Sequence, residues 1–146
     1  IHQTSRENIN YLRNFYQINN IESNVFSFDQ NLNELMKQSD LCISRSGASS
    51  LAEMSLMNIP FIAVPLPSSK DNHQYENANF YKKNNCWWTL DQDDFEEKIE
   101  SLLMSILNNK IEYFEKKENL KKLNYQNTWN NVNQNLLGIL NENWIS

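Results

Sequence analysis

Short apolar runs alternate along the chain with longer segments in which apolar residues recur every three or four positions. A short apolar run bounded by turn residues is typical of a buried strand, whereas the wider spacing predicts an amphipathic helix. Strands are expected at 25–28, 41–44, 61–64 and 86–90, after a first strand that ends near residue 3. Helices are expected at 4–19, 32–38, 48–57, 72–83, 94–107, 110–123 and 128–144. Because strands and helices alternate, the pattern predicts an α/β fold with a parallel sheet flanked by helices.

The ends and faces of these helices carry further signals. Thr4, with Glu7 three residues later, fits a capping box at the start of the first helix. Asn58 and Asn85 follow predicted helices, where asparagine tolerates the left-handed backbone that often ends a helix. Apolar stripes lie on the first helix (Ile9, Leu12, Tyr16), on 94–107 (Phe95, Ile99, Leu102, Leu103, Ile106) and on the last helix (Trp129, Val132, Leu136, Leu140).

Charge and cysteine content narrow the classes of function. The net charge of -5 and the pI of about 5.0 argue against a broad nucleic-acid surface, which needs a basic face. They still allow one anionic ligand at a helix N-terminus. Cys42 and Cys86 provide neither a disulfide framework nor a zinc spacing, so buried, reduced thiols are expected. The sequence has no catalytic triad, metal cluster or P-loop, and we expect no metal and no cofactor.

The strongest candidate for a binding site is the segment Ser44-Arg45-Ser46-Gly47-Ala48-Ser49-Ser50-Leu51-Ala52-Glu53, which follows a predicted strand and opens a helix. Small residues let backbone amides approach a ligand closely, and a helix N-terminus favours phosphate. Glu53, about one turn inside the helix, is suited to accept hydrogen bonds from a ribose diol. The same residues also fit a plain strand-to-helix turn with serine caps and a surface glutamate.

A second candidate is Asp71-Asn72-His73-Gln74-Tyr75-Glu76-Asn77, at the next strand-to-helix turn. Open α/β sheets bind ligands at the carboxyl ends of their strands, and Gln and Asn both donate and accept hydrogen bonds. The two turns are therefore expected to face one ligand, although an aspartate N-cap on a solvated helix is the alternative. His2-Gln3-Thr4 forms a third such turn, for which a solvated His2 beside a capping Thr4 is the alternative.

These motifs resemble the MurG-type transferases, a family of the GT-B class of glycosyltransferases. The resemblance rests on 44–53, Ile59-Pro60-Phe61, Pro65-Leu66-Pro67, 71–78, His2-Gln3-Thr4 and Phe28 followed by Leu32, and covers roughly residues 1–90. Ser5, Asp29 and Asn31 depart from it, since the family has Gly, an apolar residue and Asp there. The resemblance implies a Rossmann-like domain, the C-terminal half of a GT-B glycosyltransferase.

For the nucleotide, the resemblance implies contacts from the first helical turn after Gly47. The amides of Ala48 and Ser49 are expected to hold a diphosphate, with Ser50 nearby. Glu53 is expected to bind the ribose diol, and Arg45 to organise the loop.

For the sugar and the base, the resemblance implies contacts from two other turns. Gln74, helped by His73 and Asn77, is expected to hold the sugar hydroxyls. The backbone near Phe28 and Asp29 is expected to recognise uracil.

The resemblance also implies an activity for the whole protein. Members of the family transfer N-acetylglucosamine from UDP-N-acetylglucosamine to a lipid-linked muramoyl-pentapeptide (lipid I to lipid II) in peptidoglycan synthesis. They act peripherally at the cytoplasmic face of the membrane and require no metal. The acceptor domain, with its catalytic base, and a Gly-Gly-Ser loop are expected to precede Ile1, so this chain alone is expected to be inactive.

We therefore expect residues 1–123 to form the nucleotide-sugar-binding domain and 124–146 to form a helix that crosses back to that upstream domain. Lipid and membrane contacts are expected through the upstream domain. One alternative is a stand-alone UDP-sugar-binding subunit of a two-chain membrane glycosyltransferase. Another is a non-enzymatic α/β interaction domain.

Overall fold

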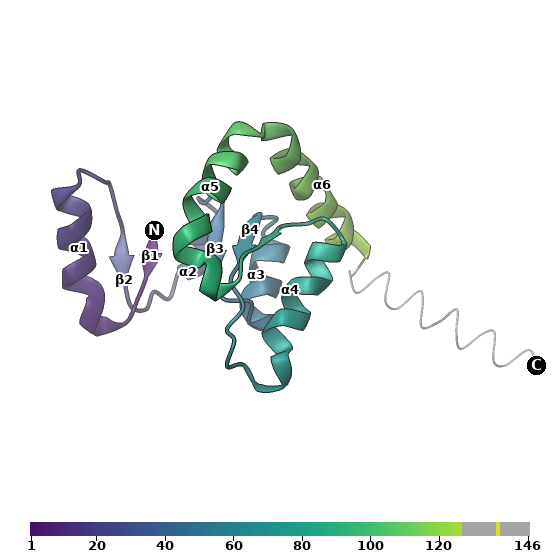
Figure 1. Cartoon of the computed structure of the whole chain (residues 1–146), viewed down its shortest axis with the longest axis horizontal. Coiled ribbons are helices and arrows are strands. Elements are labelled where there is room, and N and C mark those ends of the chain that lie inside the picture. The colour runs from purple at the N-terminus through teal and green to yellow at the C-terminus, as the bar shows by residue number, and fades with distance from the viewer. Residues whose placement is uncertain (127–136, 138–146) are drawn as a thin grey trace, which may run out of the picture. The chain divides into compact units, whose positions relative to one another are not determined.

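The computed structural model describes residues 1–126 and residue 137, and the chain divides into two compact units, Ile1–Ser39 and Asp40–Ser146. Figure 1 labels most of the helices and strands of the two units. In the described residues, every strand pairing is parallel and each unit holds one small sheet, of strands β1-β2 in the first and β3-β4-β5 in the second. The prediction of an α/β fold with parallel strands and flanking helices is confirmed.

The N-terminal unit is built from two strand-to-helix repeats. Its elements are β1 (His2–Gln3), the 3-10 helix η1 (Arg6–Asn8), α1 (Ile9–Ile18), β2 (Val25–Phe26) and α2 (Leu32–Met36). Parallel pairing sets His2 opposite Val25 and Gln3 opposite Phe26. Ile9, Leu12 and Tyr16 are the half-buried residues of α1, as their spacing predicts.

The C-terminal unit continues the same alternation and ends in two helices. Its elements are β3 (Cys42–Ser44), α3 (Ala48–Leu56), β4 (Phe61–Ala63), η2 (Lys70–Asn72), α4 (His73–Lys83), β5 (Trp88–Thr89), η3 (Gln92–Asp94), α5 (Phe95–Asn108) and α6 (Lys110–Gln126). Each predicted helix and strand up to residue 123 is present, with boundaries displaced by a few residues.

Successive side chains of a strand point to opposite sides, and strand β4 of the C-terminal unit is buried on both, whereas Ile43 of the edge strand β3 is 44 % exposed. On one face, Ile62, Val64, Trp88 and Leu90 form a buried cluster with Ile106 of α5. The other apolar residues of the α5 stripe that was predicted from sequence pack against this cluster: Phe95, Ile99, Leu102 and Leu103.

Aromatic rings fill the other face of the sheet. The rings of Phe61 and Trp87 have their centroids 3.6 Å apart, and Tyr81 of α4 lies 3.6 Å from Trp87 on centroids. The Trp87 indole N–H donates to the Ala78 carbonyl at 3.3 Å, which satisfies its buried donor. This face therefore fixes α4 against β4 and the start of β5.

Helix α6 is tied to the rest of the unit near both of its ends. The Tyr113 hydroxyl donates to the Asp40 carbonyl at 2.7 Å. Near the C-terminal end, the Ser55 hydroxyl of α3 donates to Asn124 Oδ1 at 2.5 Å, and Asn124 Nδ2 donates back to the Ser55 carbonyl. The last described turn of α6 is therefore held against the C-terminal half of α3.

The structure confirms one prediction about the helix ends and contradicts another. Asn58 and Asn85 have φ values of 55° and 51°, so the predicted left-handed asparagines are confirmed. The capping box at Thr4 is wrong: the N-cap is Ser5, which makes no side-chain capping bond, and the helix opens with a 3-10 turn. The Thr4 amide instead donates to the Phe26 carbonyl at 2.9 Å, which holds Thr4 to the β1-β2 ladder.

The predictions for the cysteines and for the last helix have different outcomes. Both cysteines are free thiols, with Cys86 fully buried and Cys42 half-buried. The helix predicted at 128–144 lies outside the described residues, so the proposed division into 1–123 and 124–146 stays a prediction. Helix α6 itself continues to Gln126, three residues past its predicted end.

Candidate functional site

The turn from β3 to α3 presents free backbone amides. Gly47 is the N-cap of α3, with φ -67° and ψ 141°, and it has no side chain with which to cap the helix. The first N–H groups of a helix have no partner within it, so those of Ala48, Ser49 and Ser50 point out of the helix end. Ala48 and Ser49 are exposed. Among the described residues these N–H groups have no hydrogen-bond partner, and they lie at the positive end of the helix dipole.

The turn from β4 to α4 is shaped by its own side chains. Gln74 Oε1 accepts the Leu66 backbone N–H at 3.0 Å, and His73 Nδ1 lies 2.5 Å from the Lys70 carbonyl, to which it can only donate. Asp71 and Asn72 have φ values of 52° and 54°. Asn72 is the N-cap in a left-handed conformation without a side-chain capping bond, so the predicted aspartate N-cap is wrong.

Three hydrogen bonds join these two turns. Asn77 Nδ2 donates to the Ser46 carbonyl at 3.1 Å, and one guanidinium nitrogen of Arg45 lies 3.4 Å from both the Val64 and the Pro65 carbonyls. The two turns adjoin because they follow paired residues of adjacent parallel strands, Ser44 of β3 and Ala63 of β4. The two turns therefore lie at the same edge of the sheet, and that they face one ligand stays a prediction.

The geometry assigns several candidate residues to holding the loops. Arg45 contacts two backbone carbonyls of the neighbouring turn, and its role as the loop organiser stays a prediction. Asn77 likewise donates its amide N–H to the Ser46 backbone carbonyl, and the Gln74 amide oxygen accepts the Leu66 backbone N–H. Gln74 Nε2 makes no hydrogen bond among the described residues, and the Glu53 side chain is exposed and likewise without a partner there.

Ser46 is a residue of this site that the sequence did not single out. It is 0 % exposed, and its hydroxyl has no hydrogen-bond partner among the described residues. A buried polar atom without a partner is unusual in a folded protein. Its position inside a run of small residues gave no signal, because small residues serve turns equally well whether they are buried or exposed.

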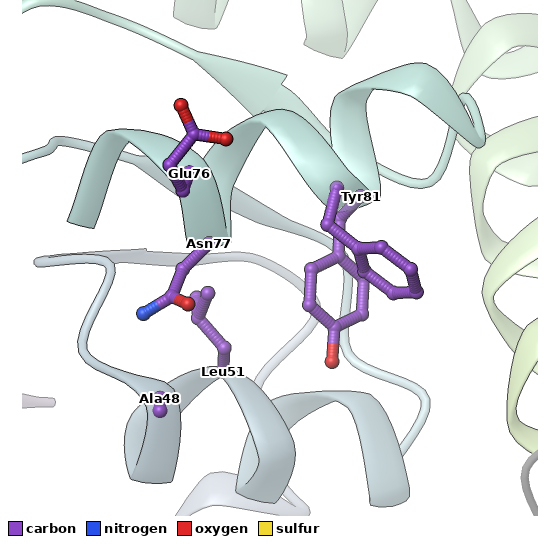
Figure 2. Close-up of a pocket in the computed structure, with 6 residues that line it drawn as sticks. Ala48, Leu51, Glu76, Asn77 and Tyr81 are labelled. Atoms are coloured by element: carbon purple, nitrogen blue, oxygen red, sulfur yellow. The ribbon is translucent and has the colours of Figure 1, made fainter. Parts of the chain in front are cut away.

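A cleft opens between α3 and α4 beside the joined turns, and we call it the α3/α4 cleft. It has a volume of about 360 Å³. It is lined by Ala48 and Leu51 of α3 and by Glu76, Asn77, Phe80 and Tyr81 of α4. Figure 2 shows Asn77 and Tyr81 descending from α4 toward the Ala48–Leu51 segment of α3.

The remaining candidates lie in the N-terminal unit. Phe28 is 72 % exposed, and Asp29 Oδ1 accepts the Asn31 backbone N–H at 2.7 Å, which shapes the turn from β2 to α2. His2 Nδ1 lies 2.8 Å from the Tyr16 hydroxyl. The alternative of a solvated His2 beside a capping Thr4 is therefore wrong, because His2 is half-buried against α1.

The described residues provide neither a cluster of metal ligands nor a helix that could span a membrane. Among residues 1–126 and 137, no group of three or more His, Cys, Asp or Glu side chains converges as a metal site would require. None of the helices described is both long and apolar enough to cross a membrane.

The chain is similar to one family of known proteins over most of its length. The family model of the glycosyltransferase family 28 C-terminal domain matches residues 1–131. A protein from Pelagibacter ubique named UDP-N-acetylglucosamine--N-acetylmuramyl-(pentapeptide) pyrophosphoryl-undecaprenol N-acetylglucosamine transferase is 44% identical over 142 residues, which are 97% of this chain and 40% of the relative. A Rickettsia bellii protein of the same name is 37% identical over 67% of this chain and 28% of its own length.

A solved structure shares the fold. The crystal structure of Acinetobacter baumannii MurG superposes with a TM-score of 0.71 at 23% sequence identity, and the match covers 83% of this chain and 35% of that one. The chain thus spans less than half the length of each of these proteins.

Proposed function

Since the chain belongs to the glycosyltransferase family 28 C-terminal domain family, we propose that it is the donor-binding domain of a UDP-N-acetylglucosamine-dependent transferase. The observation that carries the proposal is the α3 N-terminus, where uncapped amides stand beside a second turn that is hydrogen-bonded to the first. The relatives named for this activity are 44% and 37% identical to the chain.

The diphosphate is the part of the donor that the α3 N-terminus suits best. The amides of Ala48 and Ser49, with Ser50 beside them, offer N–H donors at the positive end of the helix dipole. When the bond between the sugar and the diphosphate breaks, negative charge builds on the departing UDP. Amides that are already oriented stabilise that charge without reorganising.

The ribose and the sugar are then bound by side-chain groups that make no hydrogen bond within the two turns. Glu53 is one turn along α3 from the amides, and its exposed carboxylate accepts two hydrogen bonds from the ribose diol. Gln74 is oriented by the Leu66 N–H through its oxygen, so its Nε2 donates to a sugar hydroxyl. His73 Nδ1 is bound to the Lys70 carbonyl, so Nε2 is the ring nitrogen that remains for a contact with the sugar.

Other residues of the proposed site act by positioning. Asn77 and Arg45 hold the backbone of the two turns, which sets the direction of the Ala48 and Ser49 amides. In the N-terminal unit, the backbone beside Phe28 and Asp29 is proposed to read uracil, and the exposed Phe28 ring offers a stacking surface.

We infer the activity of the whole protein from the names of its relatives. It transfers N-acetylglucosamine to a lipid-linked muramoyl-pentapeptide, peripherally at the cytoplasmic face of the membrane, with the acceptor and the membrane bound by another domain. The matching region makes up 40% of one longer chain in the Pelagibacter ubique relative, which favours a single-chain enzyme over a two-chain one.

Titration calorimetry with UDP-N-acetylglucosamine tests the proposal, on protein expressed from the complete coding sequence. Glu53→Ala and Gln74→Ala should each weaken binding by about 1–3 kcal/mol, the usual result of removing one partner of a hydrogen bond. Glu100→Ala is the matched control, because Glu100 is an exposed acid on α5. Affinities that stay equal in all three variants would show that the site is wrongly assigned.

A further inference from the structure

A serine–asparagine pair holds each end of α3 to a neighbouring helix, and only the C-terminal pair is complete. In that pair the Ser55 hydroxyl donates to Asn124 Oδ1 at 2.5 Å, and Asn124 Nδ2 donates back to the Ser55 carbonyl. Just before α3, Asn77 Nδ2 donates to the Ser46 carbonyl at 3.1 Å, which corresponds to the second of these bonds. Figure 2 shows the Asn77 amide pointing from α4 toward α3. The pair before α3 therefore makes half of the contacts that the other pair makes.

The incomplete pair leaves two complementary groups without partners. Among the described residues, neither the Ser46 hydroxyl nor Asn77 Oδ1 makes a hydrogen bond. Ser46 is 0 % exposed, so bulk solvent does not reach its hydroxyl, and an unpaired polar group in such a place raises the free energy of the fold. Because a serine hydroxyl is redirected by rotation about χ1 alone, the arrangement of Ser55 and Asn124 is within reach of this pair.

The position of the incomplete pair connects it to the proposed diphosphate site. Ser46 precedes Gly47, the N-cap of α3, by one residue and precedes Ala48 by two. A shift of Ser46 toward α4 therefore redirects the first free amides of α3. Amide N–H groups that converge on one point repel one another until an anion lies between them, so the free protein resists this shift. A bound diphosphate removes the repulsion and favours the shift.

We propose that Ser46 and Asn77 form a latch that closes on ligand binding: the Ser46 hydroxyl donates to Asn77 Oδ1 once a diphosphate occupies the α3 N-terminus. The inference rests on the proposed function, because the UDP part of the donor is the ligand that closes the latch. A ligand shifts an equilibrium through its preference for one state, and here the closed state is preferred. Ser46 is thus a positioning residue, which acts on the ligand through the amides of Ala48 and Ser49.

Ser46→Ala tests the latch in protein expressed from the complete coding sequence, by calorimetric titration with UDP and by denaturant unfolding of the free protein. Because the hydroxyl has no partner before binding, the unfolding midpoint should be unchanged or higher. UDP affinity should fall about fivefold, which corresponds to about 1 kcal/mol, because the closed latch loses its second bond. Ser55→Ala is the matched control. Its hydroxyl is already bonded in the free protein, so the unfolding midpoint should fall and UDP affinity should stay unchanged.

A double-mutant cycle shows whether the effect of Ser46 passes through Asn77. Asn77→Ala removes the acceptor, so adding Ser46→Ala to it should lower UDP affinity by less than about twofold further. An equal loss in both backgrounds would overturn the latch, as would wild-type UDP affinity or a lower unfolding midpoint in Ser46→Ala. Each of these results leaves the proposed function standing, since the wild-type protein still binds UDP. A wild-type protein that does not bind UDP would overturn the proposed function, and the latch with it.

Discussion

The side-chain amide of Asn77 donates a 3.1 Å hydrogen bond to the backbone carbonyl of Ser46, which lies 31 residues earlier in the chain. The bond joins α4 to the loop that leads from β3 into α3, near the carboxyl edge of the sheet. It means that the geometry of the α3 N-terminus depends on a residue of a different helix.

Asn77→Ala should therefore affect both folding and binding. The Ser46 carbonyl loses its partner, and an unsatisfied group of this kind costs about 1–3 kcal/mol of unfolding free energy. Denaturant unfolding measures the loss, and UDP affinity should fall as well. Asn79→Ala is the control, because Asn79 lies on the same helix and makes no side-chain hydrogen bond among the described residues. Equal unfolding free energies for the two variants would contradict the role of Asn77.

Gly47→Asp should change stability and binding in opposite directions. An aspartate N-cap accepts the free amides of α3, and this stabilises the helix by a few tenths of a kcal/mol relative to glycine. The same carboxylate occupies the proposed phosphate site and repels the diphosphate, so UDP affinity should fall about tenfold or more. A Cβ at Gly47 meets no atom within 4 Å, which makes Gly47→Ala a fitting control. Unchanged UDP affinity in Gly47→Asp would argue that the ligand binds elsewhere.

Gln74→Glu separates the two ends of the Gln74 amide. The carboxylate still accepts the Leu66 N–H, so the loop should remain in place, but the donor proposed for the sugar is lost. Affinity for UDP-N-acetylglucosamine should fall about fivefold relative to affinity for UDP, as expected for one hydrogen bond of about 1 kcal/mol. Because repulsion by the new charge acts on both ligands, the ratio isolates the sugar contact. A constant ratio would remove Gln74 from the sugar site.

The thiol of Cys86 should make stability depend on alkaline pH. Burial raises the pKa of Cys86 from 9.0 to about 11, while the Lys116 ammonium lowers it in part. Between these values the unfolded chain has lost the thiol proton and the folded chain retains it, so the unfolding free energy falls as pH rises. Unfolding curves from pH 8 to 11 should show a shallower fall in Cys86→Ala. Parallel curves for the two proteins would mean that the folded and unfolded thiols titrate alike.

The strands and helices could be predicted because their signals are local. The stripe from Phe95 to Ile106 indicates which side of α5 is buried, and Asn58 and Asn85 mark helix ends through their tolerance of positive φ. The start of α1 was predicted wrongly because Thr4 is already engaged by the Phe26 carbonyl, a partner 22 residues away. Long-range pairing of this kind overrides a capping signal that spans four residues.

The residues of the candidate site could be predicted from the sequence, but the contacts that each of them makes could not. The succession of two strand-to-helix turns indicates that residues near 48 and 74 lie at one edge of a sheet. It does not indicate that the Asn77 N–H and the Gln74 oxygen are used by the backbone. Nor does it reveal the buried Lys116, whose ammonium donates to Asn85 Oδ1 at 2.7 Å and lies 5.1 Å from the centroid of the Trp88 ring. Such contacts depend on how α6 packs, which no local pattern encodes.

We propose that the amides at the start of α3 bind the diphosphate of a UDP-sugar. The most direct test follows the backbone amide resonances of the ¹⁵N-labelled chain by NMR during titration with UDP-N-acetylglucosamine, which detects weak binding as well as strong. We expect the largest shifts at Ala48, Ser49 and Ser50, and we expect that UDP reproduces them and that uridine without phosphate does not. Shifts that avoid these three amides, or that uridine reproduces in full, would contradict it.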